Sequence, residues 1–187
     1  AGHIIGRVGS SPGIVVATPG AEPPATGGYA AVVLLDTWLS LGRDDVRSEE
    51  EALRRWCNAA ALVAPGAEVL AVGDASEPTI QALVRWDPAG FAERLIAERQ
   101  SAHLPPASRM ATISGAVEDL SAVQLDLPPG GEALGPVLID EAQSRLVLRV
   151  PRAQGAQLSS ALRDLQANRS ARKLPHLRVQ VDPLVLT

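Results

Sequence analysis

The stretch Arg47-Ser-Glu-Glu-Glu-Ala-Leu-Arg-Arg-Trp-Cys-Asn-Ala-Ala-Ala-Leu-Val-Ala-Pro-Gly66 begins with charged residues and ends with apolar ones. Ser48 and Glu51 have the S-x-x-E spacing of a capping box, in which each side chain binds a free backbone N–H of the first turn. Three acidic residues in that turn suit the positive end of the helix dipole. The apolar end stops at Pro-Gly, which terminates helices. We therefore predict a docked structural helix over residues 48–64.

Short apolar runs lie on both sides of this helix. The runs Ile14–Thr18, Ala31–Asp36 and Glu68–Gly73 are bounded by Gly, Pro or Asp, which is typical of strands buried on both faces of a parallel sheet. The 48–64 helix would cross over between the second and the third of them. Neither a GxxxxGK[ST] motif nor a GxGxxG motif after a strand occurs, so the sequence contains no glycine-rich phosphate loop. Three strands are too few for a complete doubly wound sheet, and we interpret the chain as part of a larger protein.

A second helix is predicted to begin at Asp87-Pro88, with Asp as the N-cap and Pro at the first helical position. It would run to Ala102 and place Phe91, Leu95 and Ile96 on one face. The Leu104-Pro105-Pro106 sequence ends it and marks a boundary. We therefore expect three parts: a first domain over 1–86, a connecting helix and linker over 87–106, and a second domain over 107–187.

The second domain is expected to contain four strands and two helices. The strands are predicted over 109–114, 134–140, 145–150 and 177–181, and the helices over 116–127 and 153–170. The order β-α-β-β-α-β predicts a small α+β, ferredoxin-like sandwich of one antiparallel sheet with two helices on one face. This fold class hosts many nucleic-acid and protein binders, but a fold alone assigns no function.

The composition excludes several classes of protein. The chain is 46% hydrophobic and 20% charged, which is ordinary for a globular protein, and no apolar run reaches the ~18–20 residues that span a bilayer. No secretory signal pattern is present. Cys57 is the single cysteine, so neither an intrachain disulfide nor a cysteine-based zinc site is expected, and the three histidines lack metal-ligand spacing. We expect a cytoplasmic location and no contact with membranes.

The charge is unevenly distributed along the chain. The formal net charge is −4, yet residues 145–178 hold eight basic side chains and only Asp164 as an acid, a local net charge of +7. A basic end on an acidic protein indicates a polyanion or an acidic peptide as partner. The alternative is a solvated face on which basic residues cluster by chance.

Arginines on one predicted strand are the strongest candidates for binding. In Arg145-Leu-Val-Leu-Arg149 the two arginines alternate with apolar residues, so both should point to the outer face, where Arg152 can join them. A further basic group, Arg169, Arg172 and Lys173, lies at the end of the last helix. Arginine binds phosphate and carboxylate equally well, so DNA and an acidic peptide both stay open. Because few aromatic residues lie nearby, contact with a nucleic-acid backbone is favoured over base stacking.

Several short motifs occur in an order that resembles a known family. They are Val32–Asp36 followed by Asp45-Val-Arg47-Ser-Glu-Glu50, then Phe91–Arg99, Leu104–Pro106, Leu134-Gly-Pro-Val137 and Val181-Asp-Pro183. Together they resemble the C-terminal part of the primosomal protein N′ (PriA) family of replication-restart DNA helicases. The resemblance implies that residues 1–86 are the later part of a second RecA-like helicase lobe with a parallel sheet. Residues 107–187 would be the family's C-terminal domain, which contacts DNA and partners.

The chain departs from this family at two motifs, a loop that in the family couples ATP to DNA and a helix end that in the family presents two arginines to ATP. The loop Ala17–Pro23 replaces a G-T-Q-M-x-x-K-G pattern and has no lysine, and Leu62 and Pro65 replace the two arginines of a Q-V-x-G-R-A-G-R motif. In related nucleotide hydrolases such an arginine is worth on the order of 10³–10⁵ in rate. We therefore expect no catalytic residues and no cofactor here. By resemblance, ATP with magnesium and zinc would bind segments outside this chain.

The resemblance also indicates partners. It implies a primosome component in replication restart that binds branched or single-stranded DNA, other primosome proteins and the acidic tail of single-strand-binding protein. In the family a glutamine and a basic residue hold this tail; Gln157 matches the glutamine, and Arg152 would replace the basic residue, whose position falls on Ala153. One alternative is an active ATP-dependent 3'-5' DNA helicase with its missing motifs upstream. A second is a structural protein-interaction module that does not bind DNA.

Overall fold

The structure is a computed structural model that describes residues 5–42 and 45–183. The chain has a mixed α/β architecture and divides into two compact units, residues 1–93 and residues 94–187. No helix in the described ranges is both long enough and apolar enough to span a membrane.

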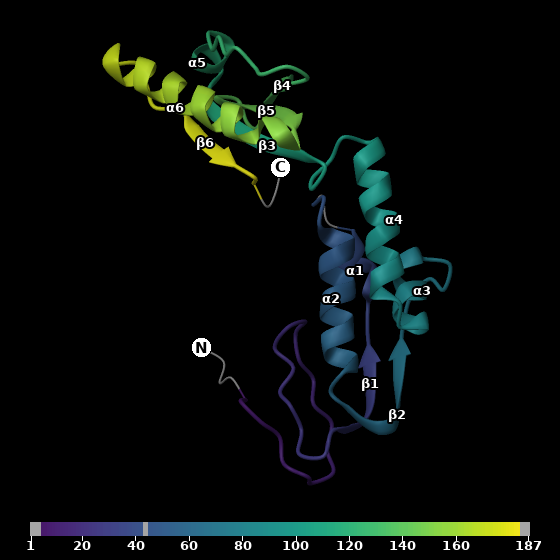
Figure 1. The fold of residues 1–187 in the computed structure, drawn as a ribbon. Helices are drawn as coiled ribbons and strands as arrows, with labels where there is room; N and C mark the ends of the chain where they lie inside the picture. Colours follow the sequence, from purple (N-terminus) through teal and green to yellow (C-terminus); the bar gives the residue numbers. More distant parts are fainter. Residues whose placement is uncertain (1–4, 43–44, 184–187) are drawn as a thin grey trace. The chain divides into compact units, whose positions relative to one another are not determined.

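The first unit contains a parallel pair of strands with helices in the crossover between them (Figure 1). Strand β1 pairs with strand β2, as predicted for the apolar runs at 31–36 and 68–73. The predicted helix, α2, lies between them in the chain, together with α1, which was not predicted. Helix α3 follows β2. The bounds are β1 Tyr29–Leu34, α1 Thr37–Leu41, α2 Ser48–Ala60, β2 Val63–Ala71 and α3 Pro78–Arg85.

Helix α2 forms the core of this unit. It lies against α1 and α3. It buries Leu53 and Trp56, and α3 buries Ile80 and Leu83. At ~1.5–3 kcal/mol for each large apolar side chain removed from water, these residues give α2 its fixed position. The prediction of a docked structural helix is confirmed in this respect.

The ends of α2 differ from those predicted. The helix stops at Ala60 instead of residue 64, because Val63 already pairs with Tyr29 of β1. The predicted capping box is wrong, since no side chain caps the helix and Glu51 binds Arg54 and Arg55 instead. A turn at Val46 and Arg47 precedes the helix, and the Asp45 Oδ1 accepts a hydrogen bond from the Arg47 N–H at 2.9 Å.

The strand predicted over Ile14–Thr18 is also wrong. Ile14 and Val16 are 94% and 91% exposed, and the segment has no regular structure. The prediction presupposed neighbouring strands on both sides, but in the described part of the chain none pairs with this run. Within the described part of this segment, an isolated bridge pairs Val8 with Ala25.

Helix α4, Pro88–Ser101, begins as predicted. Asp87 Oδ1 accepts a hydrogen bond from the Gly90 N–H at 2.8 Å, which confirms Asp87 as the N-cap. Phe91 and Leu95 are buried as expected, whereas Ile96 is half exposed.

The second unit contains a four-stranded antiparallel sheet in the order β4-β5-β3-β6. Its elements follow the predicted order β-α-β-β-α-β, except that the first helix has five residues instead of twelve and a 3₁₀ turn precedes the second. The bounds are β3 Ser108–Ala116, α5 Val117–Ser121, β4 Glu132–Leu138, β5 Gln143–Pro151, η1 Arg152–Gln154, α6 Gly155–Ala171 and β6 Arg178–Val181.

One face of this sheet carries the core of the second unit. Leu148 and Val150 of β5 and Ile113 of β3 are completely buried in one cluster with residues of α5 and α6. Both helices therefore cover the same face, and α6 lies along it (Figure 1). Because side chains alternate along a strand, Arg145 and Arg149 project from the opposite face.

Candidate functional site

The arginines of β5 lie on the sheet face that the helices leave uncovered. Arg145 pairs with Ser114 of β3, and Arg149 pairs with Met110 of the same strand. The Arg145 Nε–H donates to Ser114 Oγ at 3.3 Å. On β5 the buried Leu148 points to the helix-covered face, and Arg145 and Arg149 point to the other face. The predicted common orientation is therefore present, and we call this surface the arginine face.

The sheet register adds a basic residue that sequence reasoning missed. Arg178 of β6 pairs with Ser114 from the other side, so Ser114 lies between Arg145 and Arg178 in one row across three strands. Residues directly opposite each other share a face of the sheet. Arg178 is exposed. The alternation of Arg178-Val-Gln-Val could have assigned it a face, but the strand order that places it beside Arg145 is not visible in the sequence.

Arg149 and Arg152 already contact their own chain. Arg149 forms an ion pair with Glu132 of β4, and its Nη1–H donates to the Ala102 carbonyl at 3.2 Å. The Arg152 Nη1–H donates to the Pro106 carbonyl at 3.1 Å. These contacts hold the side chains in fixed orientations. An anionic ligand would have to compete with them.

Gln157 lies in the first turn of α6 and is exposed. It follows the 3₁₀ turn that carries Arg152 and Ala153. The two residues that the family resemblance assigns to an acidic peptide are thus on adjacent elements.

The basic group at the end of α6 is divided by the structure. Arg169 is only 7% exposed, forms an ion pair with Asp119 at 2.7 Å, and donates from Nη2 to the Pro175 carbonyl at 2.8 Å. Arg172 and Lys173 are exposed. All three belong to the helix layer, on the opposite side of the sheet from Arg149. The structure therefore gives Arg169 internal contacts and leaves Arg172 and Lys173 at the surface.

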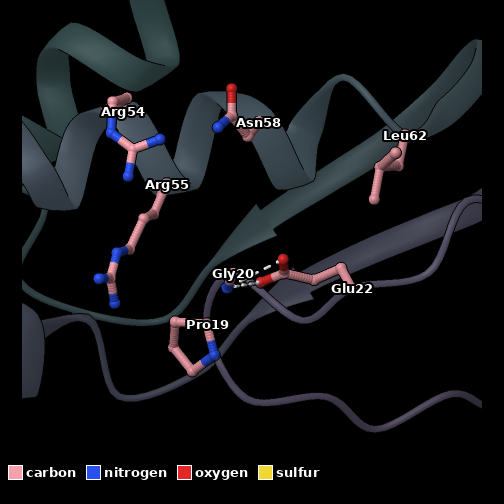
Figure 2. A pocket seen from close by; sticks show the side chains of 7 residues that line it. All are labelled: Pro19, Gly20, Glu22, Arg54, Arg55, Asn58 and Leu62. Carbon is pink, nitrogen blue, oxygen red and sulfur yellow. Dashed lines mark hydrogen bonds between the residues drawn. The ribbon is translucent and has the colours of Figure 1, made fainter. Parts of the chain in front are cut away.

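A hollow of about 470 Å³ lies in the first unit, between the loop around Gly20 and the side of α2 (Figure 2). Its two walls carry the loop 17–23, which the resemblance matches to a motif that couples ATP to DNA, and Leu62, which replaces a family arginine presented to ATP. Leu62 lies in its lining. Pro65 lies in β2 and is exposed. The lining residues are Pro19, Gly20, Glu22, Arg54, Arg55, Asn58 and Leu62.

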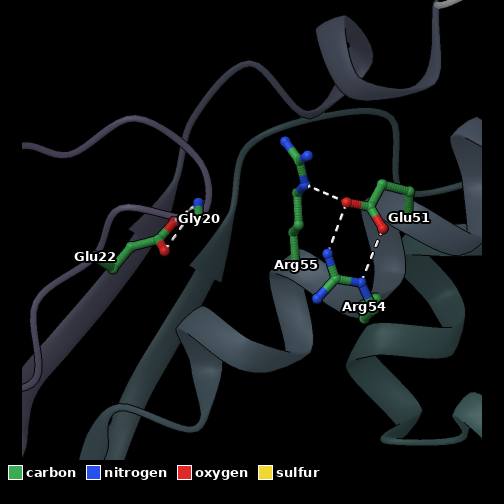
Figure 3. A network of polar contacts seen from close by, with 5 residues as sticks. All are labelled: Gly20, Glu22, Glu51, Arg54 and Arg55. Atoms are coloured by element: carbon green, nitrogen blue, oxygen red, sulfur yellow. Dashed lines mark hydrogen bonds and ion pairs between the residues drawn. The ribbon is translucent and has the colours of Figure 1, made fainter.

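The arginines of the hollow share one carboxylate, as Figure 3 shows. Glu51 accepts from Arg54 and from Arg55, each at 2.7 Å, and these bonds lower the Glu51 pKa from 4.5 to about 2. On the loop side, Glu22 accepts both its bonds from the Gly20 N–H, at 2.9 and 3.0 Å. Two carboxylates therefore offset the two guanidinium groups, so the hollow has no net excess of positive charge from these side chains.

Clusters of side chains that could bind a metal ion are absent from the described residues. Over the ranges 5–42 and 45–183, no group of three or more His, Cys, Asp and Glu side chains converges on a common point. Burial raises the pKa of the Cys57 thiol, which opposes the thiolate form that binds metals.

Comparison with known proteins identifies relatives over nearly the whole chain. The family described as primosomal protein N C-terminal domain matches residues 100–184. The chain is similar to the probable replication restart protein PriA of Mycobacterium leprae (strain TN), with 46% identity over 97% of this chain and 31% of that protein. It is 40% identical to the probable replication restart protein PriA of Mycobacterium tuberculosis (strain CDC 1551 / Oshkosh), over 97% of this chain and 32% of that protein. The chain thus spans about a third of the length of these relatives.

Proposed function

We propose that this chain binds DNA and partner proteins in replication restart. The premise is that the chain belongs, through residues 100–184, to the primosomal protein N C-terminal domain family. The ligands would be branched or single-stranded DNA, other primosome proteins and the acidic tail of single-strand-binding protein. A cytoplasmic location is part of the proposal. The main observation in its favour is the arginine face of the second unit.

The arginine face suits a phosphate backbone. Arg145 and Arg178 share a row of the sheet on either side of Ser114, whose hydroxyl can also donate to phosphate. Neighbouring strands are about 4.8 Å apart, so the two arginines start about 10 Å from each other and can reach separate phosphates. No aromatic residue is in these rows, which favours contact with the backbone over reading of bases.

The two units support finer assignments within the proposal. The strand order β4-β5-β3-β6, with both helices on one face, supports a ferredoxin-like C-terminal domain over 107–187. The parallel pair β1–β2 with α2 in the crossover supports part of a RecA-like lobe over 1–86. Residues 87–106 would connect them as helix α4 and the linker that follows.

We further propose that the first unit contributes no ATP hydrolysis. Its hollow is where the resemblance would place the nucleotide, and a phosphate group there would meet the Glu22 carboxylate. Arg54 and Arg55 are both bound to Glu51, and Leu62 has no charge to stabilise a transferring phosphoryl group.

The DNA-binding proposal can be tested by fluorescence anisotropy with the complete chain. Forked DNA, single-stranded DNA and a peptide rich in Asp and Glu should each bind at low salt, and the DNA affinity should fall steeply as salt is added. Replacement of Arg152 and Gln157 by Ala should weaken the peptide more than the DNA. Absence of binding to all three ligands at low salt would leave only a structural role for this chain.

A further inference from the structure

The linker between α4 and β3, residues 102–107, is held by arginine side chains of the second unit. Arg149 donates to the Ala102 carbonyl at 3.2 Å, and Arg152 donates to the Pro106 carbonyl at 3.1 Å. Arg99 of α4 donates to the Pro105 carbonyl at 3.5 Å. Arg149 and Arg152 lie more than 40 positions along the chain from the carbonyls they bind. Two of the proposed ligand-binding arginines therefore also attach the linker to the sheet.

Glu132 binds the second Nη group of Arg149. It pairs directly with Arg149 across β4 and β5, and its carboxylate forms an ion pair with Nη2 while Nη1 binds the linker. The Arg149 side chain is 20% exposed. A phosphate or carboxylate bound bidentately needs two N–H groups of one guanidinium edge, and arginine has five N–H groups in a fixed planar arrangement. A ligand can take the Nη edge only if Glu132 or the Ala102 carbonyl gives it up.

We propose that Glu132 and the linker carbonyls compete with external anions for Arg149 and Arg152, so that DNA bound to these arginines loosens the linker. The choice of DNA as the anion rests on the proposed function. The attachment of the linker by the two arginines does not. Ligand binding at the arginine face would then weaken the attachment of the linker that follows α4 to the sheet. This coupling lies within the second unit.

The competition is tested by Glu132→Gln, which removes the charge and keeps the shape of the side chain. Exposed ion pairs are worth up to about 1 kcal/mol, so the variant should bind forked DNA about two- to five-fold more tightly. The matched control is Glu141→Gln, an equal change of charge in the exposed bend between β4 and β5. Competition is supported if Glu132→Gln improves binding clearly more than Glu141→Gln. Equal effects would mean that only net charge matters and would overturn it.

The linker is tested by hydrogen–deuterium exchange of the complete chain, read at the amides of His103, Leu104 and Ala107. Replacing both Arg149 and Arg152 by Ala should speed this exchange about two- to ten-fold, as expected for the loss of ordinary hydrogen bonds. Arg163→Ala removes an exposed arginine of α6 and should leave it unchanged. Unchanged exchange in the double variant would overturn the attachment.

Added forked DNA should speed the same exchange in the unmodified chain. If DNA binds and the exchange stays the same, the coupling is wrong. If DNA does not bind at all, the proposed function fails, while the double variant still decides whether the arginines hold the linker.

Discussion

At the scale of single residues, Arg169 and Arg172 show that two arginines three positions apart can have different roles. The Arg169 guanidinium is enclosed between Asp119 of α5 and the carbonyl of Pro175, so it ties α5 to the segment before β6. Arg172, three residues later, is exposed at the end of α6. The first side chain stabilises the fold, and the second is accessible to a partner.

Replacing Arg169 by Ala should lower the free energy of unfolding by about 3–5 kcal/mol, because it leaves a partly buried carboxylate and a carbonyl without their donor. Arg172→Ala should change it by no more than about 0.5 kcal/mol. Urea denaturation followed by circular dichroism measures both variants. Equal stability of the two would show that the Asp119 pair contributes nothing.

Glu51 should make the free energy of unfolding depend on pH in the acid range. Its pKa is lowered from 4.5 to about 2 by Arg54 and Arg55, so its contribution is fully present above pH about 4.5 and is lost as the pH falls towards 2. Because the pair is exposed to solvent, we expect only about 0.5 kcal/mol. Glu51→Gln should remove this part of the acid slope, and 1 M salt should shrink the difference.

Thermal unfolding measured between pH 2 and pH 7 tests this expectation, with Glu68→Gln on β2 as the charge-matched control. An acid slope that is the same in Glu51→Gln and in the unmodified chain would contradict it.

At the scale of elements, local signals in the sequence predicted those elements that depend on local chemistry. Asp87 caps α4 because its carboxylate reaches an N–H three residues away, and that geometry is readable from Asp-Pro alone. The run 14–18 was wrongly predicted as a strand, whereas helix α3 was not predicted. The run 14–18 has the composition of a buried strand, but no strand within residues 5–42 and 45–183 pairs with it. Helix α3 has only eight residues and carries a weak local signal.

The arginine face could be predicted only in part. Alternation along β5 correctly gave the common side of Arg145 and Arg149. The addition of Arg178 needed the pairing of β3 with β6, and the buried state of Arg169 needed α5 to pack beside α6. Both depend on contacts between segments far apart in the sequence, which carry no local signal.

The arginine face should determine how steeply the affinity for DNA falls with salt concentration. Replacing Arg145 and Arg178 by Ala should lower the slope of log affinity against log salt by about 1–2, because each lost phosphate contact removes about 0.7–0.9. Arg163→Ala on the helix layer should leave the slope nearly unchanged. Affinity titrations with single-stranded DNA at four or more salt concentrations give the slopes. Equal slopes for all three proteins would place the DNA elsewhere.

At the scale of the whole molecule, the two units differ in what they offer to ligands. The second unit presents basic side chains on both of its layers, whereas in the hollow of the first unit the basic side chains are matched by carboxylates. The chain spans about a third of the length of its relatives. Under the proposed function, the second unit contacts DNA and partners, and the first unit is a folded lobe around α2.

The most direct test of that division is to restore the missing charges. In a protein of the relatives' length that contains this chain, changing both Leu62 and Pro65 to Arg should not produce DNA-stimulated ATP hydrolysis. Leu62 lies at the end of the hollow after α2 has finished, and residue 65 is in β2, so the new side chains would start from a turn and a strand, not from consecutive turns of one helix. The loop with Gly20 and Glu22 would still place a carboxylate where phosphate charge must be stabilised. Phosphate release measured with and without forked DNA decides the matter, and hydrolysis in the unmodified longer protein would overturn the proposal that this lobe is inactive.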